Sequence, residues 1–418
     1  MPQSNRKVIV FIAVIFVVGL ISGLTWANYL FANNYPGGSA FNNYWTGSRL
    51  LIDEGKSPYS ENIVLKTQTS GQIFGEVNDT KPSRFANPLY SIILYIPFSL
   101  VDDYVVARAL WMTLLEISLF ITALITLRFC KWKTGLAGSI IYMLLAFLAY
   151  FSVRALISGD VIILAGLFLC TGIWAILKGE DELAGAMVAL TTIKPQFGFL
   201  LIIFLIFWTI SQQRYKFSLW FFISLSFFVT LTLLIQPGWI LEFFQANIQN
   251  FGTTGFHNAA DMMREIFPGF GSRLGWIISG LIFVVLIFEW TRAKGYDSKR
   301  MLWLICVTLV GGALVGLPAP AESLVLLLPA ILFLSETILE RWKSGSLIIV
   351  LSVLGYLFLP WYVVISNLQK SDAGVEKIIV FSVIVFILIL LFWNRDWLMS
   401  SVRPWFDLLE PQIKTRKK

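Results

Sequence analysis

The stretch LAGAMVALTTIKPQFGFLLIIFLIFW, residues 183–208, is apolar on both sides of a single lysine–proline pair. A lysine at the centre of a lipid bilayer costs about 2.5–3.5 kcal/mol to insert. Proline lacks a backbone donor and disfavours helix in the residue before it, so the pair ends one helix and starts the next. We therefore expect membrane helices over residues 183–193 and 195–211, with Lys194 in the turn between them.

The composition of the chain extends this interpretation to its full length. Of the 418 residues, 57% are hydrophobic and 14% are charged, and the mean hydropathy is +0.75. A soluble domain carries about 25% charged residues, and a membrane helix needs about 20 apolar ones. We predict an all-α polytopic membrane protein in which residues 1–418 form a single integral membrane domain.

About twelve apolar segments are the predicted crossings. They cover approximately residues 8–31, 105–127, 135–152, 159–177, 183–193, 195–211, 217–236, 273–290, 301–318, 323–338, 345–366 and 377–393. A further segment, 88–101, is short and contains Pro97, so we expect it to dip into the membrane surface without crossing. The rest forms a first external loop with interfacial helices over 32–104, a second external loop over 236–272, and a basic cytoplasmic tail over 394–418.

The distribution of charge sets the orientation of these segments. With the N-terminus in the cytoplasm, most of the 32 lysine and arginine residues fall in the cytoplasmic loops and tail. That distribution satisfies the positive-inside rule. We therefore expect a multi-pass protein of the cell (plasma) membrane, with both termini cytoplasmic. The two long loops, where function is most often carried, then lie on the extracytoplasmic face.

Several kinds of site are excluded by residue type. The single histidine excludes a histidine-built metal centre, and Cys130, Cys170 and Cys306 show no metal or disulfide spacing. The basic residues lie mostly in short loops between helices, which is not a nucleic-acid signature. We therefore expect no histidine-built metal centre and no nucleic acid, with membrane lipids as the surrounding partner.

Polar residues at the predicted outer ends of helices are the first candidates for a site. Lys194 lies in a turn, and Asp160 opens a helix shortly after Arg154. A helix start favours anions, and an arginine can hold a phosphate through two bonds. The alternatives are structural, because a lysine at a helix end can snorkel to water and an aspartate can cap free N–H groups.

The predicted external loops add further candidates. Asn43, Tyr44 and Trp45 are hydrogen-bonding and stacking types suited to a sugar, although Trp and Tyr are also common at membrane interfaces. Arg84 lies at the membrane edge, where it could hold a phosphate or lipid headgroups. In the second loop, His257 and Arg264 are two of four polar groups within ten residues.

Two charged residues fall inside a predicted membrane helix. Arg108 and Glu116 are eight residues apart on segment 105–127, which corresponds to about 12 Å along a helix. They are too far apart to pair with each other. Each therefore needs a partner on another helix, or water.

Four stretches of the chain carry a resemblance to a known family. They are GGSAFNNYWTGSRLLIDEGKSPYS (37–60), FANPLYSIILYIPFSLV (85–101), SGDVIILAGLFLCTGIWAILKGEDELAGAMVALTTIKP (158–195) and ESLVLLLPAILFL (322–334). In this order and spacing they resemble glycosyltransferase family 87 of the GT-C superfamily, the polyprenyl-phosphate-sugar-dependent membrane glycosyltransferases. The resemblance implies a GT-C-like helical bundle with hexosyltransferase activity.

The reaction that the resemblance implies needs no nucleotide, metal or other cofactor. A hexose, mannose-like, leaves a polyprenyl-phosphate donor and is transferred to a lipid or glycan acceptor on the extracytoplasmic face. The residues suited to bind the substrates are Lys194, Arg84, Arg154, Arg264, Asn43, Tyr44, Trp45 and His257. A carboxylate must deprotonate the acceptor hydroxyl as the anomeric carbon is attacked.

The chain departs from the family's pattern at the position of that carboxylate. The family's catalytic Asp precedes a Phe, and here Ala40 precedes Phe41. Another external carboxylate could serve, with Asp160 first and Glu54 second. Alternatively, the chain binds or transports a lipid-linked sugar without turnover, or the two sequences align in a different register.

A second departure falls in the last of the four stretches. Many members of the family carry a His there, and Glu322 and Ser323 stand near that position.

Overall fold

The computed structural model describes residues 3–35, 37–60, 85–133, 135–250, 259–315, 320–367 and 373–399. Throughout these ranges the regular structure is helical. In chain order the helices are α1 (Gln3–Asn34), α2 (Ser39–Glu54), η1 (Leu89–Ser91), α4 (Ile92–Ser99), α5 (Tyr104–Phe129), α6 (Gly135–Leu148), α7 (Tyr150–Ser158), α8 (Ile162–Lys178), α9 (Asp181–Thr191), α10 (Pro195–Ser211), α11 (Tyr215–Ile235), α12 (Trp239–Asn250), α13 (Ala259–Ile266), α14 (Gly271–Thr291), α15 (Ser298–Val315), η2 (Ala321–Leu327), α16 (Leu328–Arg341), α17 (Gly345–Asn367), α18 (Ala373–Trp393) and α19 (Arg395–Met399).

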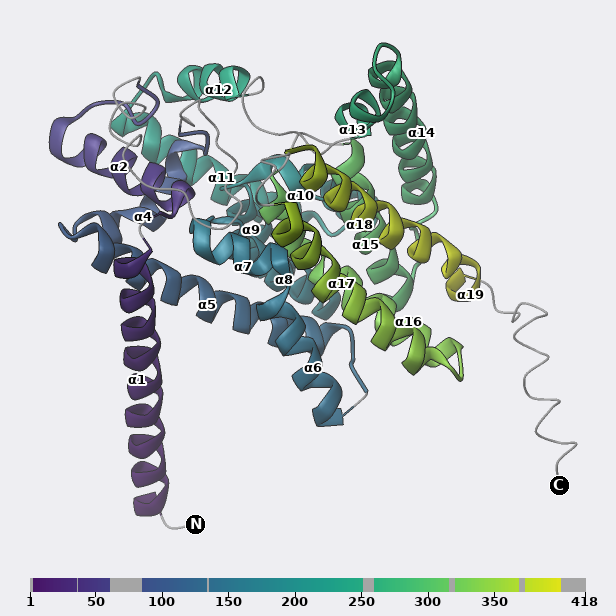
Figure 1. Ribbon diagram of the computed structural model, residues 1–418, viewed down its shortest axis with the longest axis horizontal. Coiled ribbons are helices and arrows are strands. Elements are labelled where there is room, and N and C mark those ends of the chain that lie inside the picture. Colours follow the sequence, from purple (N-terminus) through teal and green to yellow (C-terminus); the bar gives the residue numbers. More distant parts are fainter. Residues whose placement is uncertain are drawn as a thin grey trace, which may run out of the picture.

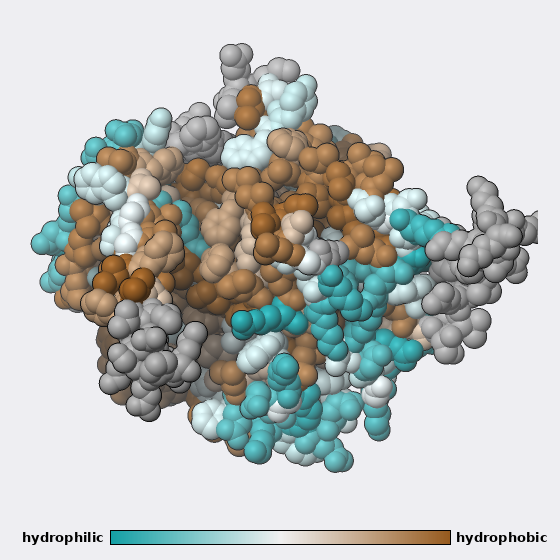
Figure 2. Space-filling view, turned by 90° about the horizontal axis from the view of Figure 1, so that it is seen from below, coloured by the Kyte–Doolittle hydropathy of each residue, from teal (hydrophilic) through white to brown (hydrophobic). Residues whose placement is uncertain are grey.

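Many of these helices are suited to a membrane. Seven of the described helices are long and apolar enough to cross one, and α6 with α7, bent by 49°, makes an eighth candidate. Their outward side chains are apolar along most of their length, and Figure 2 shows the resulting broad hydrophobic surface, with hydrophilic side chains at the lower right and along the left edge. The predicted class, an all-helical multi-pass membrane protein, is confirmed, while the count of twelve crossings stays a prediction.

One predicted helix is broken in the structure, and another changes its helix type along its length. Segment 135–152 becomes α6 and α7, because Ala149 between them has an extended backbone with φ −60° and ψ 138°. The carbonyl of Leu148 at this break accepts a hydrogen bond from Trp361 Nε1 at 3.0 Å. Segment 323–338 begins as the 3-10 helix η2 before it continues as α16.

The two predicted external loops contain helices of their own. The first, 32–104, includes α2, η1 and α4, and the second, 236–272, includes α12 and α13. Figure 1 shows α2 and α12 at the upper left, away from both chain termini. Of the predicted tail 394–418, the described part ends with α19.

The charged residues inside α5 find partners on other helices, as predicted. Arg108 is fully buried and donates to two carbonyls, Tyr35 O at 2.8 Å and Ile157 O at 3.0 Å, at the ends of α1 and α7. Asn28 of α1 donates to Glu116 at 2.8 Å. Because unpaired polar groups are costly in a bilayer, these bonds fix α1 and α7 to α5.

Helix α9 packs closely against both α8 and α11. At Gly185 of α9, a side-chain carbon would lie 2.3 Å from the carbonyl oxygen of Phe217 in α11, so only glycine allows this approach. Close contact through small residues is the usual way in which membrane helices associate. This packing positions the ends of α8 and α9, where the candidate site lies.

Candidate functional site

Two buried ion pairs lie around the starts of α8, α10 and η2. Lys194 Nζ is paired with Asp160 Oδ2, and the two side chains are only 8% and 7% exposed. Arg154 Nε donates to Glu322 Oε1 at 2.6 Å, with side chains 16% and 9% exposed. We call these four residues the buried charge cluster. It joins α7, the start of α8, the start of α10 and η2.

Local sequence explains how Asp160 reaches this position. Gly159 ends α7 in the left-handed region, with φ 72°, which glycine adopts without strain. The next residue, Asp160, accepts the backbone N–H of Ile162 at 2.8 Å through Oδ1 and so caps α8. The predicted capping role is therefore present together with the ion pair.

Lys194 is held by the break that Pro195 imposes. The lysine is the N-cap residue of α10, with a non-helical φ of −140°, and proline occupies the first turn. Because the helix cannot continue backward through proline, the lysine side chain turns aside to Asp160. The expectation that Lys194 lies in a turn between two helices is confirmed.

The first-loop block packs directly against this turn. A side-chain carbon on Gly159 would lie 2.6 Å from Cβ of Phe41, and Trp111 Nε1 donates to the Gly159 carbonyl at 2.8 Å. Phe41 also stacks on Trp111, with ring centroids 5.5 Å apart. The start of α2, including the half-buried Ala40, is therefore fixed beside the residue that precedes Asp160.

Tyr44 belongs to the same neighbourhood. Its ring stacks on Tyr95 at 4.4 Å, and the Tyr95 hydroxyl accepts a bond from Asn87 Nδ2 at 3.2 Å. Burial, and next the negative charge of Asp160, raise the pKa of Tyr44 well above its usual range. The phenol therefore stays protonated at physiological pH and is available as a hydrogen-bond donor.

Unsatisfied polar atoms lie close in sequence to the ion-paired residues. Within the described part of the chain, Ser152 Oγ, Gln196 Oε1, Glu322 Oε2 and Ser323 Oγ are buried and have no hydrogen-bond partner. Each such group costs about 1–3 kcal/mol if nothing completes it. The two serine hydroxyls are able to donate to an anionic ligand, whereas the amide oxygen of Gln196 and the carboxylate oxygen of Glu322 accept hydrogen bonds and are suited to a ligand hydroxyl.

Other residues predicted for the site lie apart from the buried charge cluster. Arg264 pairs with Asp261 on its own helix and is 62% exposed. Glu54 lies at the end of α2 opposite to Phe41 and pairs with Lys56 at 2.8 Å near the surface. Trp45 donates to the Val101 carbonyl at 3.3 Å, in the turn before α5.

The remaining predicted residues have mixed outcomes. Asn43 is buried on α2, next to Tyr44. Arg84 and His257 lie outside the described residues. No group of three or more His, Cys, Asp or Glu side chains that could hold a metal ion occurs among the residues that the structure describes.

Glu322 is the member of the cluster that sequence reasoning did not select. It is 168 positions from Arg154, so no local pattern joins the two. Two signals were present. Glu322 stands near the position at which many family members carry a His, and it lies at the start of a helix shortly after Pro320, much as Lys194 adjoins Pro195. A charged residue at a proline-bounded helix start within apolar sequence is the common feature.

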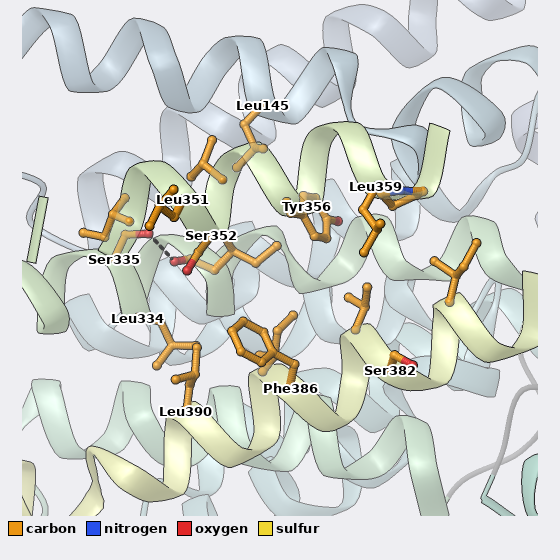
Figure 3. Close-up of a pocket in the computed structure, with 18 of the residues that line it drawn as sticks. Leu145, Leu334, Ser335, Leu351, Ser352, Tyr356, Leu359, Ser382, Phe386 and Leu390 are labelled. Atoms are coloured by element: carbon orange, nitrogen blue, oxygen red, sulfur yellow. Dashed lines mark hydrogen bonds between the residues drawn. The ribbon is translucent and has the colours of Figure 1, made fainter. Parts of the chain in front are cut away.

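An apolar cavity of about 750 Å³ lies between α6, α16, α17 and α18 (Figure 3). Its wall carries Leu145, Leu334, Phe386 and other apolar side chains, and Pro360 lines it near one end of α17. The next residue, Trp361, contacts Tyr150 with ring centroids 5.3 Å apart.

The Tyr150 contact links the cavity to the charged residues. Arg154 Nη1 donates to the Tyr150 hydroxyl at 2.9 Å. Three side chains in contact, Trp361, Tyr150 and Arg154, thus connect the cavity wall to the buried charge cluster.

Comparison with known proteins agrees with the family resemblance, and the match includes two of the four stretches, 85–101 and 158–195. A sequence model of glycosyltransferase family 87 matches residues 85–318, more than half of the chain. The matched part contains Arg154, Asp160 and Lys194, while α2 and Glu322 lie outside it. No curated protein matches the sequence. The chain therefore belongs to glycosyltransferase family 87, a family of membrane glycosyltransferases.

Proposed function

We propose that this protein transfers a hexose, mannose-like, from a polyprenyl-phosphate donor to a lipid or glycan acceptor on the extracytoplasmic face of the plasma membrane. Family membership supplies the class of reaction. The observation that carries the rest is the buried charge cluster, in which two cations meet three helix starts beside unsatisfied polar atoms. The lipid-phosphate sugar is the donor substrate, and the proposal includes no metal or other cofactor.

The donor phosphate binds to Lys194 and Arg154 in this proposal. An ammonium about 4 Å from a phosphate gains on the order of 4 kcal/mol at an effective dielectric of 20, before desolvation. The starts of α8 and α10 add N–H groups that favour an anion. Until the phosphate arrives, Asp160 and Glu322 neutralise the two cations, which would otherwise be costly to bury.

Helix length supports a site placed below the outer membrane surface. Helix α8 has 17 residues, about 25 Å at 1.5 Å per residue, against about 30 Å for the hydrocarbon core. A site at its Asp160 end therefore lies a few ångströms inside the apolar layer. A phosphate on a lipid tail reaches that depth without pulling the tail into water.

The apolar cavity is suited to part of that tail. Its lining is mostly hydrocarbon, and one end adjoins Trp361, which contacts Tyr150 beside Arg154. On the other side of the cluster, Tyr44 and Asn43 are suited to bind the sugar. The aromatic ring of Tyr44 and its protonated hydroxyl offer stacking and a hydrogen bond.

A topology of about twelve crossings completes the proposal. Helices α8, α10, α18 and the shorter α9, continued by the turn to Lys194, cross together with the eight long candidates. Both termini are then cytoplasmic, and the buried charge cluster faces outward. Cysteine labelling from each side of sealed vesicles tests this arrangement, and a label on residue 60 from the cytoplasmic side alone would contradict it.

The experiment that tests the function uses purified protein in detergent with tritium-labelled polyprenyl-phosphate mannose and a membrane lipid extract as the acceptor. We expect labelled mannose to move to the lipid acceptor and polyprenyl phosphate to be released. Transfer in a system without compartments cannot be transport. Donor binding without transfer supports the non-catalytic alternative that Ala40 suggests, and Ala40→Asp is then the variant to assay beside the natural protein.

A polyprenyl-phosphate hexose that co-purifies with the protein, detected by mass spectrometry, provides a second measurement. If no such donor co-purifies and the protein also has no affinity for added polyprenyl-phosphate mannose or glucose, the proposed function is overturned.

A further inference from the structure

Glu322 has a feature that distinguishes it from the other carboxylate of the cluster. Its Oε1 accepts the bond from Arg154, while its Oε2 is buried and has no hydrogen-bond partner within the described residues. The side chain is 91% buried, so water at the protein surface does not satisfy this oxygen. A buried carboxylate oxygen left unpaired is costly unless something else completes it.

Asp160 lacks such an oxygen. Its Oδ1 accepts the N–H of Ile162, and its Oδ2 is paired with Lys194. A proton placed on either oxygen would weaken the cap of α8 or leave the buried ammonium without its partner. Asp160 is therefore suited to position Lys194 and α8 rather than to take up a proton.

We propose that Glu322 is the general base of the transfer, in the role that Ala40 cannot fill. This inference rests on the proposed function. Glu322 Oε2 accepts the proton of the acceptor hydroxyl. At the same time the oxygen of that hydroxyl forms a bond to the anomeric carbon of the hexose. The bond from this carbon to the phosphate oxygen breaks at the same time, and its electron pair leaves with the lipid phosphate.

The contacts of Arg154 connect the two halves of this step. The same guanidinium holds Glu322 through Nε and Tyr150 through Nη1. When the donor phosphate binds Arg154 and Lys194, its negative charge offsets theirs. Less positive charge then acts on the Glu322 carboxylate, which accepts a proton more readily. After transfer, the cations stabilise the leaving phosphate and the protonated Glu322 needs no counter-charge.

The test compares Glu322→Gln with a matched control on the same helical segment. Glu336 lies 14 residues further along, about 20 Å away, and is also buried with an unpartnered Oε2. Glu322→Gln keeps the shape of the side chain and removes the proton acceptor. Turnover of polyprenyl-phosphate mannose, binding of the same donor and thermal unfolding are measured for wild type, Glu322→Gln, Glu336→Gln and Asp160→Asn.

We expect Glu322→Gln to lower kcat by about 10²- to 10⁴-fold while donor affinity changes by only a few-fold. Glu336→Gln keeps kcat near wild type. Asp160→Asn weakens donor binding and lowers the unfolding temperature. Formate added to Glu322→Ala partly restores turnover, because it supplies a carboxylate to the vacated space, and a purely structural glutamate would show no such rescue.

Two outcomes would overturn the inference. One is a Glu322→Gln protein that turns over at near the wild-type rate. The other is loss of turnover in Glu322→Gln matched by equal loss of folding and no formate rescue. In both cases wild-type transfer leaves the proposed function standing, whereas a wild type that neither binds nor turns over the donor rejects the proposed function itself.

Discussion

The helical segment formed by η2 and α16 carries glutamates in opposite situations at its two ends. At one end Glu322 is buried and shares a single oxygen with Arg154. At the other end Glu340 pairs both oxygens, one with Lys133 at 3.0 Å and one with Lys299, and these lysines are 72% and 39% exposed. We call Lys133, Lys299 and Glu340 the peripheral charge cluster.

The difference between the two ends shows how burial changes the contribution of an ion pair to stability. Exposed pairs contribute about 0–1 kcal/mol and suffice to tie helix ends together at a membrane surface. Buried pairs incur a desolvation cost that their attraction offsets only when the geometry is good. A membrane protein with several apolar alternatives retains such groups mainly where they bind or react. The four predictions below test this contrast, from the largest expected effect to the smallest.

Lys194→Met gives the largest effect. It leaves the carboxylate of Asp160 buried without its cation, which costs about 3–5 kcal/mol, and it removes a proposed phosphate ligand. Lys299→Met, in the peripheral charge cluster, is the control and costs about 1 kcal/mol or less. Unfolding in detergent and sugar transfer are measured for both, and equal losses of stability would contradict the contrast between the clusters.

Gly159→Ala tests how closely α2 must approach the cluster. Both Gly159 and Gly179 end a helix with positive φ, at 72° and 84°. An alanine at either site costs about 1–2 kcal/mol for the left-handed backbone, but only at Gly159 does the new carbon meet Phe41 at 2.6 Å. We expect Gly159→Ala to lose about 2–4 kcal/mol and Gly179→Ala about half of that. Similar unfolding free energies for the two variants would show that α2 moves away from the new side-chain carbon without loss of stability.

Two buried tryptophans form a matched pair for activity. Trp111 and Trp303 are both fully buried, and each donates through Nε1 to a carbonyl at 2.8 Å, of Gly159 and of Leu391. Phe at either position should cost about 1–3 kcal/mol. Only Trp111→Phe should also slow transfer several-fold, because it loosens the turn that holds Asp160. If the two variants have equal stability and equal transfer rates, the turn held by Trp111 does not affect the reaction.

Glu340→Gln should have the smallest effect. Removing the charge from the peripheral charge cluster should change stability by about 1 kcal/mol or less, and the change should shrink further in high salt, since exposed pairs are screened. Transfer should stay at the wild-type rate. A salt-insensitive loss of several kcal/mol in a denaturation series would mean that this cluster is effectively buried.

Much of the helical framework could be predicted from hydropathy and proline alone. The apolar segments 195–211 and 345–366 match α10 and α17 to within one residue at each end. Other boundaries were harder to predict. At the break before Ala149, the Leu148 carbonyl accepts a hydrogen bond from Trp361, more than two hundred residues away, and no local pattern announces such a partner. The count of crossings also exceeds what helix length alone supports, since α8, α9 and α10 are short.

The candidate site divides in the same way. Asp160 and Lys194 could be selected because charged residues at helix starts are rare in apolar sequence, and Arg154 because it shortly precedes Asp160. Residue type alone did not show that Tyr44 lies near the cluster while Trp45 and Glu54 do not. Which face of α2 meets the cluster is decided by its contact with Gly159, and this contact leaves Trp45 beside Val101 and Glu54 at the far, exposed end.

The sequence by itself determined that this chain is a helical membrane protein, to which family it belongs, and where its helices break beside charged residues. These properties are local, because side-chain hydropathy and the missing N–H of proline act within a few residues. Only the tertiary structure decided which charges meet, since Lys194 and Asp160 are 34 positions apart and Arg154 and Glu322 are 168 apart. The physical reason is that a buried charge is stable only beside an opposite one, and that partner is chosen by how the helices pack.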